Sequence, residues 1–247
     1  MTLTIAGKEL RTLFASPLAW VVLAFLQLVF VWIFLHRIEY FLTVQGQLAR
    51  VPNAPGLTEI AVVPVFGVAS IVLLMSVPLL TMRLIAEERR NQTITLLISA
   101  PVSMTQIILG KFLAMLAFLG IVCALIVLMS LSLLPGGSLD FGLLLANVIG
   151  LLLLAASFAA IGLFVSCLTN HPVVAAVLSL AVFLGLWIVN IAAADPESAL
   201  NHVSLLAHFE PFMNGSVAVK SLVYFALLIA AFLILSVRRL DADRLRA

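Results

Sequence analysis

Six long apolar runs dominate the pattern of hydrophobic and polar positions along the chain. None of the six carries Lys, Arg, Asp or Glu in its core. At about 1.5 Å rise per residue, a helix of each run is long enough to cross the roughly 30 Å hydrocarbon layer of a membrane. The pattern therefore predicts transmembrane helices at residues 17–36, 62–82, 112–134, 141–168, 172–194 and 219–237.

The composition supports this interpretation. Of the 247 residues, 64% are hydrophobic and only 10% are charged, whereas a soluble domain has about 25% charged residues. We therefore expect an all-α polytopic membrane protein, with residues 1–247 forming one transmembrane domain in the lipid bilayer. The net charge of +2 and the lack of a Lys/Arg-rich run with interleaved aromatics argue against nucleic acid as a partner.

Two features outside the six cores are also informative. Residues 2–14 interleave apolar and charged side chains, which predicts an amphipathic helix lying on the inner leaflet. Pro64 and Pro78 fall near the two ends of the second run. Because proline removes a backbone donor, we expect that span to be bent or locally unwound.

The basic residues predict the orientation, because loops on the cytoplasmic side carry an excess of Lys and Arg. An even number of spans places both termini on one side, and the cytoplasm is the better choice for that side. The inside set would be Lys8, Arg11, Arg83, Arg89, Arg90, Lys111, Arg238, Arg239, Arg244 and Arg246. The outside set would be Arg37, Arg50 and Lys220.

The longest cytoplasmic connection, residues 83–111, has a helical charge pattern at its start. Arg83 and Glu87 are spaced i, i+4, and Glu87 and Arg90 are spaced i, i+3, so they can pair along one helix face. The pattern predicts a helix over 83–90 that extends the second span into the cytoplasm. It would leave Glu88 and Arg89 free for a partner protein. The alternative is a solvated charged flank that only stops membrane insertion.

The sequence lacks the motifs of common active sites. It has no G-x-x-x-x-G-K-[ST] phosphate loop, no G-x-S-x-G elbow and no His/Glu pattern at zinc spacing. We therefore expect no enzyme, no catalytic residue and no cofactor on this chain. His202, His208 and Met213 are weak candidates for a metal such as copper. Interfacial hydrogen bonding by the histidines is the preferred interpretation, because two His six residues apart lack a third ligand.

The cytoplasmic connection also carries a family pattern. It contains Glu87-Glu88-Arg89-Arg90, Thr93-Ile94, Leu96-Leu97, Ala100-Pro101-Val102 and Leu109-Gly110-Lys111. This order resembles the ABC-2 type permeases, most closely the six-helix branch associated with gliding motility. Lys8-Glu9-Leu10 and Ser16-Pro17 also match, and the resemblance covers nearly the whole chain.

Two positions depart from the family pattern. Gln92 replaces a glycine before Thr93, and Thr95 replaces a glutamate. The first costs the turn backbone freedom. The second removes a charge that would face an ATPase.

The resemblance implies a permease subunit in the bacterial cytoplasmic (inner) membrane, moving a substrate by export. ATP and Mg would be bound by a separate cytoplasmic ATPase subunit. The working unit would hold two permease chains, identical or related, and a membrane-anchored accessory subunit would fit this branch. Residues implied in ATPase coupling are Arg83, Glu87, Glu88, Arg89, Arg90, Thr93 and Pro101.

Two other functions stay open at this point. The chain could be a scaffold that recruits an ATPase to a surface machine without transporting anything. It could also be an ion-coupled carrier, although such carriers keep ionisable residues within their spans and the six runs have none. A neighbouring gene for a Walker-type ATPase would favour the ATP-driven transporter or the scaffold over the ion-coupled carrier.

Overall fold

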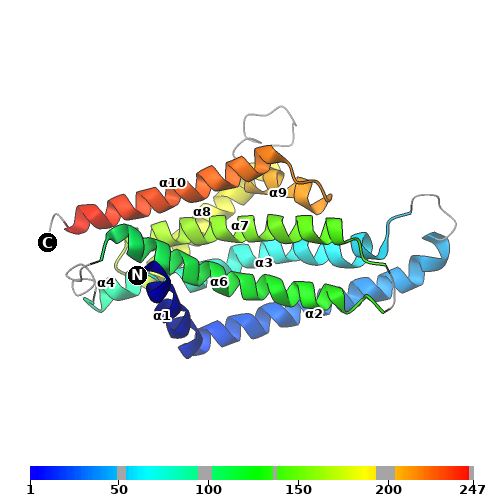
Figure 1. Cartoon of the computed structure of the whole chain (residues 1–247), viewed down its shortest axis with the longest axis horizontal. Coiled ribbons are helices and arrows are strands. Elements are labelled where there is room, and N and C mark those ends of the chain that lie inside the picture. Colours follow the sequence, from blue (N-terminus) through cyan, green and yellow to red (C-terminus); the bar gives the residue numbers. More distant parts are fainter. Residues whose placement is uncertain (49–53, 94–101, 136–137, 193–203, 245–247) are drawn as a thin grey trace.

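The chain folds into long helices, mostly aligned, with shorter helices at their ends (Figure 1). The computed structural model describes residues 1–48, 54–93, 102–135, 138–192 and 204–244, and no strand occurs among them. The helices are α1 (Thr2–Ala15), α2 (Pro17–Leu48), the π-helix η1 (Thr58–Val62), α3 (Val63–Thr81), α4 (Ala86–Arg90), α6 (Met104–Leu131), α7 (Phe141–Leu168), α8 (Pro172–Ala192), α9 (Leu205–Met213) and α10 (Val219–Arg244).

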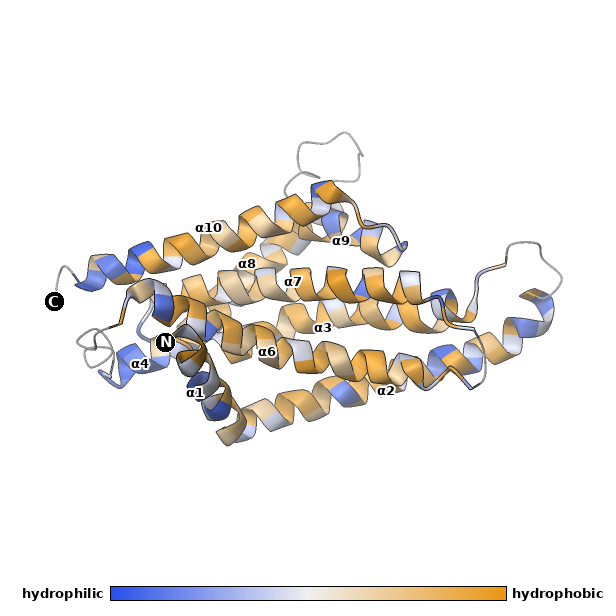
Figure 2. Cartoon of the chain, in the orientation of Figure 1, coloured by the Kyte–Doolittle hydropathy of each residue, from blue (hydrophilic) through white to orange (hydrophobic). Residues whose placement is uncertain are grey.

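The all-α prediction and the six spans are confirmed. Within the described residues, six helices are long and apolar enough to cross a membrane. Several helices continue beyond the predicted spans: α2 ends at Leu48, α6 begins at Met104 and α10 ends at Arg244. The apolar run marks only the part that fits in lipid, whereas helical hydrogen bonding continues into the polar flanks, as the blue ends in Figure 2 show.

The chain begins and α10 ends at the same end of the bundle (Figure 1). We call this end, which also holds α4, the α4 end. An even number of spans requires this arrangement. The compartment that the α4 end faces stays a prediction at this point.

Helix α7 is the centre of the bundle. It contacts α3, α6, α8, α9 and α10. Small residues let the neighbours come close: a Cβ atom added at Gly162 would lie 2.8 Å from the Cβ of Thr81 on α3. Such small-residue contacts are typical of helix packing in membranes, where close van der Waals contact replaces the hydrophobic effect between helices.

The second span is irregular near both ends, as its prolines predict. Before Pro64 the chain forms the π-helical turn η1. Pro78 lies inside α3, which ends at Thr81. A turn over residues 82–85 then separates α3 from α4, so the prediction of one continuous helix through residues 83–90 is wrong.

Helix α1 is present as predicted, and it packs closely against the first part of α6. A Cβ atom added at Gly110 would lie 2.8 Å from the Cβ of Ile5. The corner between α1 and α2 is fixed by Trp20, whose Nε1–H donates to the carbonyl oxygen of Phe14 at 2.8 Å. The place of α1 on a membrane surface stays a prediction.

The contact at Gly110 gives a first prediction. Gly110→Leu should force α1 away from α6, because the backbone of α1 also lies near, with the Thr2 carbonyl 3.2 Å from the added Cβ. Overpacking of this kind costs about 1–3 kcal/mol. We expect a lower melting temperature in detergent and faster proteolysis within α1. Gly120→Leu is the matched control on the same helix, because a Cβ there meets nothing within 4 Å. Equal stability of the two variants would contradict the close packing of α1.

Candidate functional site

The predicted coupling residues gather at the α4 end. Of the seven, the structure describes Arg83, Glu87, Glu88, Arg89, Arg90 and Thr93, whereas Pro101 lies outside the described residues. The six lie on the 82–85 turn, on α4 and just after it. A short helix such as α4 has no stability of its own, so its position depends on the contacts that other helices make with it.

A buried serine on α7 holds the turn before α4. Ser166 Oγ accepts hydrogen bonds from the backbone N–H groups of Ile85 at 3.1 Å and Ala86 at 3.0 Å. The same hydroxyl donates to the carbonyl oxygen of Met82 at 3.2 Å. Ser166 therefore supplies hydrogen bonds that the interrupted helix no longer provides, and it attaches the turn to the centre of the bundle.

A buried lysine on α6 holds α4 from another side. Helix α6 begins with a capping box, in which Ser103 and Gln106 bond each other's backbone N–H groups, and Lys111 lies about two turns further along. Its side chain is only 2% exposed. Lys111 Nζ lies 2.8 Å from Glu88 Oε1 on α4 and 3.1 Å from Glu9 Oε1 on α1. One ammonium group therefore joins three helices.

The last turns of α10 hold the opposite side of α4. Arg89 Nη2 donates to a carboxylate oxygen of Asp243. Arg239 Nη2 lies 3.8 Å from the other oxygen of Asp243. Both Arg89 and Asp243 are mostly buried, so α10 contributes a fixed contact rather than a loose surface pair.

These contacts correct the expectation that Glu88 and Arg89 are free for a partner. Both residues pair within the chain. The expected Arg83–Glu87 pair is present at 4.0 Å, and Arg83 Nη1 also donates to Ser16 Oγ at 3.2 Å. The expected pair between Glu87 and Arg90 is absent from the described part of the chain, and Glu87 pairs with Arg83 alone there.

The most exposed residues of this segment lie at the end of α4 and just after it. Arg90, Asn91, Gln92 and Thr93 are all exposed. Gln92 has a φ of 57°, in the left-handed region where glycine is the residue without strain. A glycine at this position, as in the family pattern that the connection resembles, would adopt this angle without strain. Thr93 closes the turn, with its backbone N–H donating to the Glu88 carbonyl at 3.0 Å.

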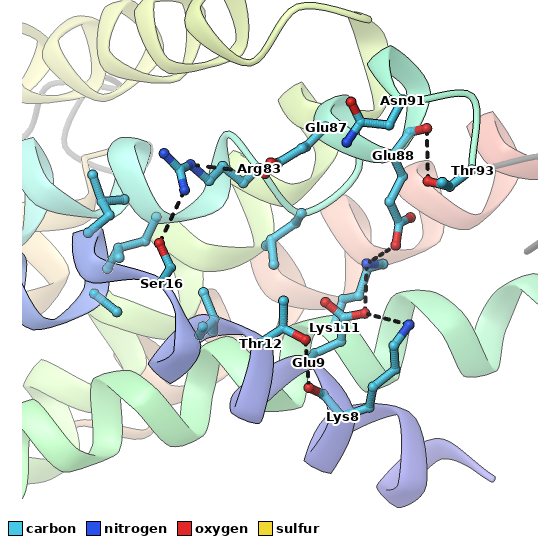
Figure 3. Close-up of a pocket in the computed structure, with 15 residues that line it drawn as sticks. Lys8, Glu9, Thr12, Ser16, Arg83, Glu87, Glu88, Asn91, Thr93 and Lys111 are labelled. Carbon is cyan, nitrogen blue, oxygen red and sulfur yellow. Dashed lines mark hydrogen bonds and ion pairs between the residues drawn. The ribbon is translucent and has the colours of Figure 1, made fainter.

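A cavity of about 360 Å³ lies between α1, the start of α2, the end of α3, and α4 (Figure 3). Its charged lining residues are Lys8, Glu9, Arg83, Glu87, Glu88 and Lys111. Basic and acidic groups are equal in number, and they form ion pairs with one another along the cavity lining (Figure 3). A lining with balanced charge favours neither anions nor cations. The cavity therefore fits a contact region between helices better than a binding site for an inorganic ion.

The weak metal candidates do not form a site among the described residues. His208 is buried, and its Nδ1–H donates to the Ser204 carbonyl at 2.9 Å. Its ring stacks on Tyr224 with the centroids 4.0 Å apart. Met213 packs against Gly67, and His202 lies outside the described residues. The part of the chain that is described has no group of three His, Cys, Asp or Glu able to hold a metal ion.

Sequence reasoning missed four residues that position α4: Glu9, Lys111, Ser166 and Asp243. A signal existed for two of them, because Lys8-Glu9-Leu10 and Leu109-Gly110-Lys111 belong to the quoted family pattern. Ser166 is one of several serines in apolar runs, and nothing in its local pattern distinguishes it. Asp243 follows the last span in a stretch that reads as an ordinary charged tail.

The hydroxyl of Ser166 gives a second prediction. Ser166→Ala would leave the buried N–H groups of Ile85 and Ala86 without this acceptor, at a cost of about 1–3 kcal/mol. We expect a lower melting temperature and faster hydrogen exchange in residues 82–90. Ser157→Ala is the matched control, because Ser157 is equally buried on α7 but bonds only the Leu153 carbonyl of its own helix. If both variants exchange like the wild type, Ser166 does not hold the turn.

Comparison with known proteins identifies the family of the chain. A search of curated proteins gave no match. The profile of the family described as "ABC-2 family transporter protein" matches residues 3–244, from the first turn of α1 to the last residue of α10. A match over nearly the whole length shows the family directly. The chain belongs to the ABC-2 transporter family, as a membrane permease of an ABC transporter.

Proposed function

We propose that this chain is the membrane subunit of an ATP-driven exporter and that α4 receives the movement of a separate cytoplasmic ATPase. The observation that carries the proposal is the attachment of α4. Lys111 links it to α1 and α6, Ser166 to α7, and Asp243 to α10. A push on the exposed end of α4 would therefore pass to four helices at once.

The charge distribution supports a cytoplasmic α4 end. Nine described basic residues lie on the helices and turns of this end: Lys8, Arg11, Arg83, Arg89, Arg90, Lys111, Arg238, Arg239 and Arg244. Arg37 and Lys220 lie towards the other end. Because basic residues favour the cytoplasmic side of a membrane, an ATPase in the cytoplasm would meet α4 directly.

The remaining parts of the proposal follow the family resemblance. ATP and Mg would be bound by the ATPase, and a working unit would contain two permease chains and two ATPase chains in the bacterial cytoplasmic membrane. The gliding-motility branch and a membrane-anchored accessory subunit belong to the same proposal. The strain at Gln92 supports a functional role for the end of α4, because strained backbone gathers at contact and switch sites.

The exposed charge of Arg90 gives a third prediction, which tests the function. Arg90→Glu should leave membrane abundance and melting temperature unchanged, because Arg90 is exposed and forms no ion pair with another described residue. At an ATPase interface, a like-charge contact costs several kcal/mol. We expect at least a tenfold loss of co-purified ATPase, since about 1.4 kcal/mol is tenfold. The ATPase would be the neighbouring gene product with a phosphate-loop motif.

Lys220→Glu is the matched control, because Lys220 is also exposed but lies at the opposite end of the bundle. It should retain the ATPase fully. Full retention by Arg90→Glu would reject the end of α4 as the docking surface for the ATPase. A complex that forms normally but does not hydrolyse ATP faster than the free ATPase would favour the scaffold over the transporter.

A further inference from the structure

A groove on the outer surface runs between α6 and α10, apart from the α4 cluster. Its volume is about 380 Å³ and its lining is almost entirely apolar. Ile108 of α6 forms the floor and is fully buried, while Ala230 and Ile234 of α10 form an open wall. The polar lining residues are Thr105 and Arg238, at the α4 end of the groove.

The length and the apolar lining of the groove fit a hydrocarbon chain. From Arg238 to Ala230 is eight residues of α10, or about 12 Å along a helix. The α10 side of the groove, from Ala230 to Val237, lies within the predicted span 219–237 of a candidate membrane helix, so we expect this side to face lipid over this distance. Exposed apolar side chains such as Ile234, at 55% exposure, are suited to contact with an acyl chain.

The charge at the mouth of the groove fits a phosphate. Arg238 is exposed, and no described carboxylate pairs with it. Its neighbour Arg239 lies against Asp243 instead. A guanidinium group binds phosphate oxygens in a bidentate manner. Arg238 directly follows the last apolar run, which places it at the depth of lipid headgroups, and Thr105 adds a hydroxyl nearby.

We propose that the α6–α10 groove binds an anionic phospholipid, with one acyl chain between the helices and the headgroup phosphate on Arg238. Basic pockets between membrane helices are known to favour anionic lipids in this way. The lipid would fill the outer side of the α6–α10 contact near the place where α10 reaches α4. This inference does not depend on the ATPase proposal.

The fourth prediction tests the lipid site on the full chain, purified in detergent and stripped of lipid. Binding of phosphatidylglycerol and phosphatidylcholine would be measured by native mass spectrometry. The wild type should bind phosphatidylglycerol several-fold more tightly than phosphatidylcholine. Arg238→Gln should abolish this preference, and Ala230→Trp should weaken both lipids about tenfold by filling the groove. Ala230 is exposed, so the added ring need not disturb the core.

Matched controls separate the groove from general effects. Arg244→Gln removes an exposed arginine six residues further along α10, and Ala231→Trp adds the same ring at an exposed position outside the groove lining. Both should bind lipid like the wild type. Unchanged binding in Arg238→Gln and Ala230→Trp would overturn the proposal. So would disulfide-linked dimers of Ile234→Cys in a chain lacking Cys123 and Cys167, because the occupant would then be a second copy.

Discussion

The buried ammonium group of Lys111 is the interaction on which the α4 end depends. A buried charge without partners costs several kcal/mol, so Lys111 requires the carboxylates of Glu9 and Glu88 beside it. Those partners lie on α1 and α4, two short helices at the bundle end, so one buried charge ties both of them to α6. The neighbouring residue, Gly110, lets the backbone of α1 approach α6 closely enough for the Glu9 contact.

Ser166 and Asp243 add to the contacts by which Lys111 holds α4 in place. The hydroxyl of Ser166 accepts hydrogen bonds from backbone N–H groups at the turn between α3 and α4, and the Asp243 carboxylate pairs with Arg89. A five-residue helix is thereby joined to the central helix and to both ends of the chain. The side chains that follow Arg89 are exposed, and Gln92 there adopts a backbone angle that favours glycine. A rigid attachment combined with a strained, exposed tip suits a part that passes on an external movement.

The sequence predicted the spans and α1 well because both depend on local pattern, namely apolar length and amphipathic spacing. It failed where contacts were distant in the chain. Glu88 and Arg89 looked free because the i, i+4 rule considers only partners on their own helix, whereas Lys111 is 23 residues away and Asp243 is 154 residues away. The continuous helix over 83–90 was wrong for the same reason, since Ser166 on α7 supplies the hydrogen bonds that allow the turn. Lys111 entered the sequence analysis only through the family pattern and the count of inside basic residues, because its partners Glu9 and Glu88 lie on other helices.

The most direct test of this account is the distance between α1 and α4 with and without the Lys111 charge. Spin labels on cysteines at Arg11 and Arg90, both exposed, in a chain lacking Cys123 and Cys167, would report this distance by pulsed electron paramagnetic resonance. We expect one narrow distance distribution for the labelled chain without further changes. The same distribution is expected for the control Lys8→Met, because the side chain of Lys8 is 69% exposed. Lys111→Met should broaden or shift the distribution, because two carboxylates would then face each other without a cation. An unchanged narrow distribution in Lys111→Met would contradict the central role of this ion pair cluster.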